Sequence, residues 1–203
     1  MGVALKTRRK GRPREFDPDQ ALDQALELFW RQGYEGTSLS DLVAATGISK
    51  ASLYAAFGNK EAFFHQALDR YNWRQNNCIA DLLSAPTARA SIERLLLRRA
   101  ERQTQAGHPH GCLAVNSALV GGRQSERVRQ ELIRRRAATE RLIRQRIERG
   151  QSEGDVAADA HPADLARYVT TIIQGLSVHA ASGASRAELR RVVALAMRQW
   201  PAA

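Results

Sequence analysis

The sequence contains little cysteine and no long apolar run. Cys78 and Cys112 are the only cysteines among 203 residues, too few to build a disulfide framework. No stretch approaches the roughly 18 to 20 consecutive apolar residues that a membrane-spanning helix requires, and the N-terminus does not show the central apolar stretch of a signal peptide. We therefore expect a soluble protein of the reducing cytoplasm that does not span a membrane.

Acidic residues are also outnumbered. The chain has 21 aspartates and glutamates against 31 lysines and arginines, a formal net charge of +10, which favours polyanionic partners such as nucleic acid or an anionic membrane surface. Residues 1–14 contain no acid and six basic residues, namely Lys6, Arg8, Arg9, Lys10, Arg12 and Arg14. We expect a basic N-terminal arm over 1–14, which is either a solvated tail or a segment that enters a minor groove.

Strand patterns are absent as well. Apolar residues recur at helical spacing through nearly the whole chain, and no long alternating stretch competes with that pattern. The predicted fold class is therefore all-α. The first helix is well marked, because Asp17 can cap it, Pro18 suits its first position and Gly33 ends it.

Two short helices follow the first one. Ser38 with Asp41 three residues later has the spacing of a capping box, and Gly47 ends the helix that they begin. Ser49 then caps a third helix from Lys50 to Phe57. Two short helices joined by a tight turn at a glycine are typical of a helix-turn-helix.

The third helix has two different faces. Leu53 and Phe57 are spaced to pack inward. Lys50, Ser52 and Tyr54 point the other way, where side chains can reach base edges and phosphates if the helix lies in a major groove. This pattern predicts a DNA-reading surface.

The rest of the chain predicts longer helices. A fourth helix begins near Lys60 and runs towards Pro86, and clusters of glycine and proline separate the helices that follow. These are expected at residues 92–105, 110–120, 126–149, 162–179 and 186–200. We therefore expect a helix-turn-helix domain at 15–60 and a second domain at 61–203.

Several motifs over residues 11–68 occur in the order found in a known family. They are Gly-Arg-Pro-Arg at 11–14, Ala-Leu-Glu-Leu-Phe at 25–29, Gly-Tyr at 33–34, Thr-Ser at 37–38 and Gly-Ile-Ser-Lys-Ala-Ser-Leu-Tyr at 47–54, with Phe57, Lys60 and Glu61. This region resembles the TetR family of repressors. The resemblance implies an N-terminal three-helix DNA-binding domain and a C-terminal helical domain for ligand binding and dimerisation. It implies a homodimer that binds a palindromic operator on double-stranded DNA and is released by a small-molecule effector, with no enzymatic activity and no cofactor.

The resemblance also implies which residues contact DNA. They are Thr37, Ser38, Ser49, Lys50, Ala51, Ser52, Tyr54 and Lys60, with Arg12 and Arg14 of the arm. Thr37 and Ser38 would lie at a helix N-terminus, where free N–H groups favour a phosphate. Tyr54 and Lys60 would hold phosphates, and residues 50–52 would face base edges. The alternatives are plain capping for Thr37 and Ser38, and a packed or surface aromatic for Tyr54.

The last two predicted helices have apolar stripes. Pairing each helix with its symmetry mate would form a four-helix dimer interface. The candidate interface residues are Tyr168, Ile172, Leu176, Leu189, Val193 and Met197. The alternative is that these stripes only close the core of the monomer.

An effector pocket is expected among the fourth to eighth helices. The candidate lining residues are Trp73, Cys78, His110, Cys112, Asn116 and Tyr168. The sequence leaves apolar, aromatic and anionic effectors open. The many arginines from Arg127 to Arg149 keep the anionic class open, although most of them are expected on a solvated face.

Cys112 lies in a Gly-Cys-Leu segment that resembles one branch of the family. A cysteine near a helix N-terminus can have a lowered pKa and a more reactive thiolate, so Cys112 is a candidate sensor of oxidants or electrophiles. The alternative is a packed thiol, because free cysteine is among the most buried residue types. His108 and His110 do not have zinc-finger spacing with Cys112, and we expect no metal site.

Two other classes of function remain as alternatives. An enzyme could use His110 and Cys112, but the sequence has no HExxH, no phosphate-binding glycine loop and no paired carboxylates on a helix. A nucleic-acid binder without sequence preference could use charge alone, which predicts steep salt dependence and little discrimination among duplexes.

Overall fold

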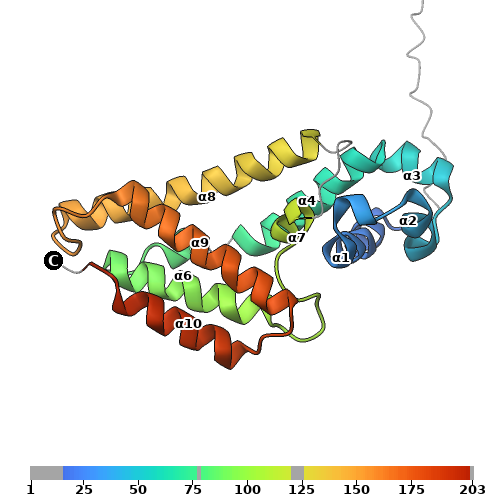
Figure 1. Ribbon diagram of the computed structural model, residues 1–203. Coiled ribbons are helices and arrows are strands. Elements are labelled where there is room, and N and C mark those ends of the chain that lie inside the picture. Colours follow the sequence, from blue (N-terminus) through green and yellow to red (C-terminus); the bar gives the residue numbers. More distant parts are fainter. Residues whose placement is uncertain (1–15, 77–78, 120–125, 202–203) are drawn as a thin grey trace, which may run out of the picture.

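The computed structural model describes residues 16–76, 79–119 and 126–201. Over these residues it contains ten α-helices and no strand, which confirms the all-α prediction. α1 (Pro18–Gly36), α2 (Leu39–Thr46) and α3 (Lys50–Phe57) form a head at one end, and α4 (Lys60–Asn76) leads out of it (Figure 1). The body consists of α5 (Ile79–Leu82), α6 (Ala88–Gln103), α7 (Leu113–Leu119), α8 (Glu126–Ser152), α9 (Pro162–Ala181) and α10 (Arg186–Arg198). Among the described helices, none combines the length and apolar character needed to cross a bilayer.

Local signals fix the first helix as predicted. The Asp17 carboxylate accepts a hydrogen bond from the Asp19 amide at 2.9 Å, and Pro18 occupies the first turn. Gly33 leaves the helical conformation with φ 72° and ψ 175°, a region that favours glycine. The helix therefore changes direction at Gly33 and ends one turn later at Gly36.

The helix-turn-helix also forms as predicted. The Ser38 hydroxyl accepts a hydrogen bond from the Asp41 amide at 3.1 Å, and the Ser38 amide donates to the Asp41 carboxylate at 2.7 Å. This is the reciprocal capping box. Gly47 ends α2 in the left-handed conformation with φ 67°, so the chain turns sharply into α3 at Ser49.

The helix expected from Lys60 towards Pro86 is described as α4, to Asn76, and as α5, Ile79–Leu82, and residues 77–78 between them lie outside the described residues. A second predicted helix starts later than expected. The helix expected at 110–120 begins only at Leu113, because Gly111 has φ 83°, which no right-handed helix accommodates. An added Cβ at Gly111 would lie 2.9 Å from the carbonyl oxygen of Ser177 on α9. The glycine thus allows the chain before α7 to lie directly against α9.

Two hydrophobic clusters form the interior of the described chain. One, the body cluster, fills the space between α6, α8, α9 and α10. The other, the head cluster, includes Phe29 and Phe64, both fully buried. The head cluster also contains Leu113 from α7 and Val128 and Leu132 from α8. The head is therefore completed by side chains from the body. This cluster crosses the boundary expected at residue 60.

Candidate nucleic-acid interface and effector cavity

α3 presents a polar face to solvent. Lys50, Ala51 and Tyr54 are exposed, while Leu53 and Phe57 are buried against the head. The Lys50 ammonium lies 5.9 Å from the centroid of the Tyr54 ring, close enough for a cation–π contact. The two residues therefore form one exposed surface, as expected of a helix that enters a groove.

The N-terminus of α3 is held by two serines. The Ser49 hydroxyl accepts a hydrogen bond from the Ser52 amide at 3.2 Å and donates to the Ser52 hydroxyl oxygen at 3.0 Å. An α-helix leaves its first amides without intrahelical partners. Ser49 is exposed and Ser52 half-buried, so both can reach a ligand at this helix end.

Thr37 and Ser38 differ more than the sequence suggests. Thr37 is fully buried, and its hydroxyl donates to the Gly33 carbonyl at 2.8 Å. A side chain in that position cannot contact a phosphate, so the expected phosphate role of Thr37 is corrected to capping of α1. Ser38 is exposed and caps α2, and its phosphate contact stays a prediction.

Lys60 lies at the start of α4, beside α1. Its ammonium is 4.3 Å from the centroid of the Tyr34 ring. Burial lowers the pKa of Lys60, and the nearby carboxylates of Glu35 and Asp41 oppose this. Lys60 is half-buried. Its contact with Tyr34 links α4 to α1, and Asp41 in the first turn of α2 lies nearby. Arg12, Arg14 and the rest of the arm lie outside the described residues.

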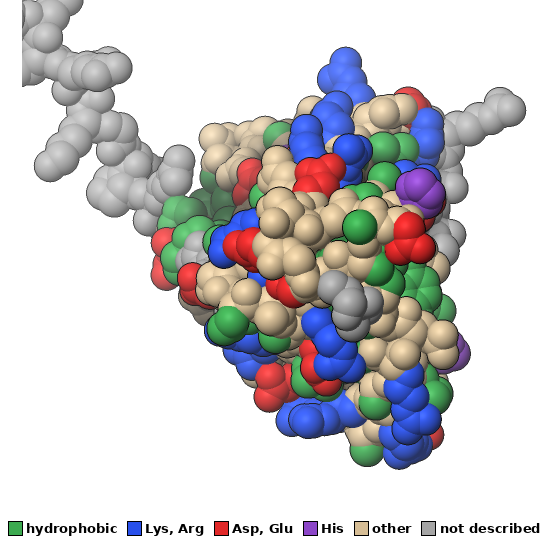
Figure 2. Space-filling view, turned by 90° about the vertical axis from the view of Figure 1, so that its left-hand side faces the viewer, with side chains coloured by type: hydrophobic (Ala, Val, Ile, Leu, Met, Phe, Trp, Pro, Cys, Tyr) green, Lys and Arg blue, Asp and Glu red, His purple; other side chains and the backbone are tan. Residues whose placement is uncertain are grey.

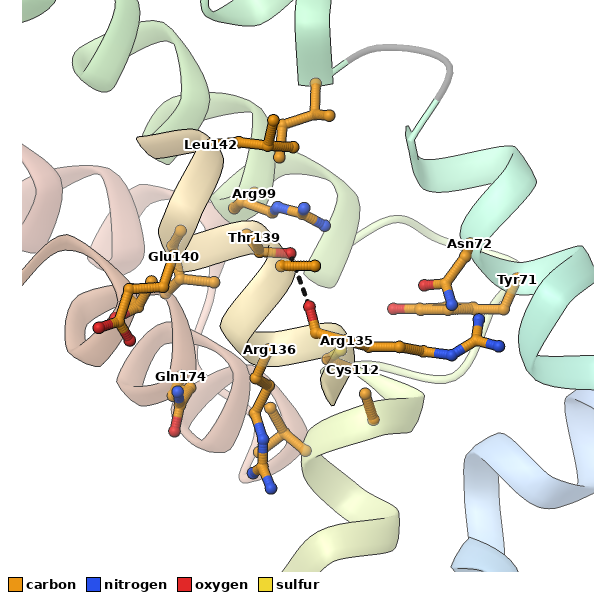
Figure 3. Close-up of a pocket in the computed structure, with 16 residues that line it drawn as sticks. Tyr71, Asn72, Arg99, Cys112, Arg135, Arg136, Thr139, Glu140, Leu142 and Gln174 are labelled. Carbon is orange, nitrogen blue, oxygen red and sulfur yellow. Dashed lines mark hydrogen bonds between the residues drawn. The ribbon is translucent and has the colours of Figure 1, made fainter. Parts of the chain in front are cut away.

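A cavity of about 230 Å³ lies in the body. Its lining comes from α4 to α9, with the Tyr71 ring on one side and Thr139 and Glu140 on the other (Figure 3). The polar lining residues are Tyr71, Asn72, Arg99, Cys112, Arg135, Arg136, Thr139, Glu140, Thr170 and Gln174. A partly enclosed cavity lined by apolar surface and several convergent polar groups is the usual form of a small-molecule site.

Cys112 is the one predicted lining residue that reaches this cavity among those that the structure describes. It is half-buried. Its thiol forms a hydrogen bond with the Tyr71 hydroxyl, and burial, followed by the neighbouring Cys112, raises the pKa of Tyr71 well above its usual value.

The other predicted lining residues lie elsewhere. His110 and Asn116 face a shallow hollow beside Trp30, where the Asn116 side-chain amide donates to the Trp30 carbonyl at 3.3 Å. Trp73 is 66% exposed on α4, and Tyr168 is 41% exposed on α9. None of these four residues lines the cavity: Trp73, Asn116 and Tyr168 lie on helix faces turned away from it, and His110 lies in the loop before α7. Cys78 lies outside the described residues.

The sequence patterns do not predict most of the residues that line this cavity. Tyr71 and Arg99 are not among the predicted lining residues. Arg135 and Arg136 fall in the run that was expected to be mostly solvated. The helical spacing of the arginines in this run does not distinguish one that lines the cavity from one that faces water.

The structure buries most of the predicted dimer-interface residues within one protomer. Leu176, Leu189, Val193 and Met197 are at most 4% exposed within one protomer and belong to its own core. They have almost no surface left for a partner to cover, so these four are corrected to core residues. Ile172 is half-buried and packs against the same cluster.

An exposed apolar row remains on the same two helices. It consists of Tyr168 and Val178 on α9 and Val192 and Leu195 on α10, each between 40% and 58% exposed. We call these four residues the outer row. α9 and α10 are adjacent (Figure 1), so the outer row is a candidate surface for a partner.

The end of the body away from the head has a mixed charge. Figure 2 views the end formed by the connection from α8 to α9, where basic and acidic side chains are intermingled and apolar ones are scattered. Arg144 pairs with Glu148, and Arg149 pairs with Glu153, both at 2.7 Å. This end therefore does not present a uniformly cationic surface for a polyanion.

Family models and individual relatives match both halves of the chain. Residues 21–67 match the model described as bacterial regulatory proteins of the tetR family, and residues 88–197 match the tetracyclin repressor-like C-terminal domain. The transcriptional repressor ComR of Escherichia coli (strain K12) is 36% identical over 197 residues, covering 95% of this chain and 92% of ComR. The repressor BdcR of the same organism is 28% identical over 97% of this chain and 95% of its own length.

Solved structures agree with these sequence matches. A cysteine variant of the TetR family regulator CifR, in a complex with a 26-base-pair double-stranded operator, is 44% identical, with a TM-score of 0.89 over 94% of this chain and all of that chain. The two family models together cover the head and most of the body. The chain therefore belongs to the TetR family of bacterial transcriptional regulators.

Proposed function

We propose that this protein is a transcriptional repressor that binds an inverted-repeat operator as a homodimer and leaves it when a small effector binds. The observation that carries the proposal is α3, an exposed helix with Lys50 and Tyr54 outward, braced by α2 and capped at Ser49. The likeness to CifR, which was solved on operator DNA, supports the same reading. Membership of a family of transcriptional regulators argues against the enzyme alternative.

Base reading is assigned to the start of α3. Lys50 can donate to guanine acceptors, the Ala51 methyl can touch a thymine methyl, and the Ser52 hydroxyl can bond to either kind of base edge. Ser38, Tyr54 and Lys60 are proposed to hold phosphates, with Ser49 at the opening of the helix. Arg12 and Arg14 are proposed to extend the contact into a minor groove.

Dimerisation is assigned to the outer row. A two-fold pair of protomers would bring the α9 and α10 helices of both copies together and bury these four side chains. Gly175 lies on α9 between Tyr168 and Val178, and an added Cβ there would meet nothing within 4 Å, which leaves room for a neighbouring helix. A dimer presents two recognition helices about 34–36 Å apart, one helical turn of DNA.

Effector release is assigned to the cavity and α4. This helix contributes Tyr71 and Asn72 to the cavity and Lys60 to the head, so one rigid element joins the two sites. An effector weakens DNA binding only if it binds the released conformation more tightly than the DNA-bound one. Cys112 is proposed as part of this site. The protein is proposed to act in the cytoplasm, where DNA is accessible.

Selection of random duplexes by the purified full-length protein tests the proposal. We expect enrichment of an inverted repeat whose half-sites are centred about one helical turn apart. Lys50→Ala should change the selected bases, while Arg198→Ala, at the far end of α10, should not. A protein that enriches no sequence, and whose binding depends steeply on salt without preference among duplexes, would support the charge-only alternative and overturn this one.

A further inference from the structure

The cavity that the proposed function assigns to the effector has an excess of positive charge. Its lining includes three arginines, Arg99, Arg135 and Arg136, and one acid, Glu140. The Glu140 carboxylate is already bound by Arg167, at 2.8 Å, from α9. It therefore does little to balance the cavity arginines.

The three arginines differ in their partners. Arg135 binds Glu131 at 2.6 Å, one turn earlier on α8, and also binds Asp69 on α4. Arg136 has no hydrogen-bond or ion-pair partner among the described residues. Arg99 extends from α6 into the space that Tyr71 lines from another side (Figure 3), and its charge lowers the pKa of Tyr71 against the larger effect of burial.

The remaining lining is apolar and the space is small. Ile79, Val115, Leu142 and Ile173 contribute aliphatic surface. A cavity of roughly 150 Å³ holds benzene, so about 230 Å³ suits a ring or branched chain with one acidic group. Arginine binds carboxylates through two parallel hydrogen bonds, which are stronger than bonds between neutral groups.

We infer that the effector is a small organic anion with an apolar body, whose acidic group binds the cavity arginines and competes with Asp69 for Arg135. The inference rests on the proposed function for the cavity and names the chemical class of its ligand. The competition links the cavity to α4, because Asp69 lies on the same helix as Tyr71 and Lys60. A bound anion weakens the Arg135–Asp69 ion pair and frees this side of α4 from α8.

Titration calorimetry of the full-length protein at fixed ionic strength tests the ligand class. The probes are benzoate, phenylacetate and 2-methylbutyrate, each with its neutral amide, and benzylamine as a cation of similar size. We expect at least one acid to bind once per protomer and at least about tenfold more tightly than its amide. An amide or benzylamine that binds as tightly as the acids, or a complete failure of all three acids to bind, overturns the inference.

Matched variants separate the cavity from the basic surface. Arg136→Gln should weaken binding of the acid about tenfold and leave binding of the amide unchanged. Arg141→Gln, on the exposed side of the same helix, should change neither. Equal losses in both variants would mean that the acids bind the cationic surface nonspecifically, and the inference would fail. Thermal unfolding of each variant checks that it is folded.

Operator binding by an Asp69 variant tests whether the anion competes with Asp69 for Arg135. Asp69→Asn should weaken operator binding about two- to fivefold, the range expected for one partly exposed ion pair, and should reduce the further effect of the acid. Unchanged operator affinity and an unchanged response to the acid would overturn the competition. Operator selection by the unliganded wild-type protein is scored separately, so failure of the proposed function is distinguishable from failure to bind an anion.

Discussion

The head and the body of this molecule are packed with different kinds of side chain. The head cluster is rich in aromatic rings, including an edge-to-face pair of Phe29 and Phe64 at 5.1 Å and a stacked pair of Phe57 and Phe63 at 4.2 Å. The body cluster is mainly aliphatic, with Trp200 as its one aromatic among the described residues. Aromatic pairs prefer a few geometries, whereas aliphatic side chains allow more ways of repacking. The difference suits a rigid head that presents α3 and a body that adjusts around a cavity.

The largest expected effect tests whether head and body are separate units. Leu132 belongs to α8 but is 1% exposed within the head cluster. Leu132→Ala should lower the free energy of unfolding by about 2–5 kcal/mol and weaken operator binding, although the residue is far from α3 in sequence. Denaturant unfolding and a binding titration measure both, with the exposed neighbour Ile133→Ala as the control, expected within about 0.5 kcal/mol of wild type. A loss confined to ligand binding would show that the two regions are independent.

The next effect concerns the outer row. Leu195 is 58% exposed on α10, and its burial in a dimer would contribute about 1.5–3 kcal/mol per copy. Leu195→Glu should shift the protein from dimer to monomer, measured by analytical ultracentrifugation over a range of concentrations. Ile133→Glu, an equally apolar position outside the row, should leave the dimer intact. If Ile133→Glu dissociated the dimer and Leu195→Glu did not, the interface would lie outside the outer row.

A smaller effect is expected at the DNA-reading helix. Lys50→Ala should weaken binding to the selected operator by about 1–3 kcal/mol and relax the preference at the base pair it reads. Tyr54→Phe removes only a hydroxyl that we assign to a phosphate, so it should weaken binding evenly across sequences. Measuring each variant against the operator and against single-base changes separates the two roles. The assignments would be reversed if Tyr54→Phe altered base preference and Lys50→Ala did not.

How much of this could be predicted depends on how far apart the interacting residues are in sequence. The caps at Asp17, Ser38 and Ser49 and the turn at Gly47 act within three or four residues, and all four were predicted. The cavity joins residues from six helices, and its geometry depends on how these helices cross. Neighbouring arginines show the limit, because the Arg134 side chain is 68% exposed and the Arg135 side chain 26%, yet nothing in their spacing distinguishes them.

The dimer stripe shows a related limit. An apolar stripe at helical spacing predicts that a helix face is covered, but it does not show whether the same chain or a second copy covers it. Leu176 and Val193 face the protomer core, whereas Val178 and Leu195, two residues further along each helix, face outward. Four of the six predicted interface residues therefore cover the core of their own protomer, and which face of these helices meets a partner stays a prediction.

The smallest expected effect is a pH dependence in the head. Hydrogen bonds from the Ser38 hydroxyl and the Ser38 amide lower the pKa of the Asp41 carboxyl below its ordinary value of 3.8. The charged carboxylate therefore contributes stability that is present above that value and is lost as the pH falls through the lowered pKa. Asp41→Asn should be less stable than wild type at pH 7, and the difference should shrink below about pH 4. A difference that is constant with pH would assign the effect to the shape of the side chain instead of its charge.

The side chains that α7 and α8 contribute to the head have a practical meaning for anyone who wishes to rebuild this regulator. A fragment cut after α4 would leave Phe29 and Phe64 without the cover of Leu113, Val128 and Leu132, and it should aggregate instead of binding DNA as an autonomous module. A chimaera that gives this reader the sensor of another regulator must keep α7 and the first two turns of α8 with it. The boundary at which the sensor can be exchanged is therefore set by which side chains pack together, and no single cut in the chain reproduces it.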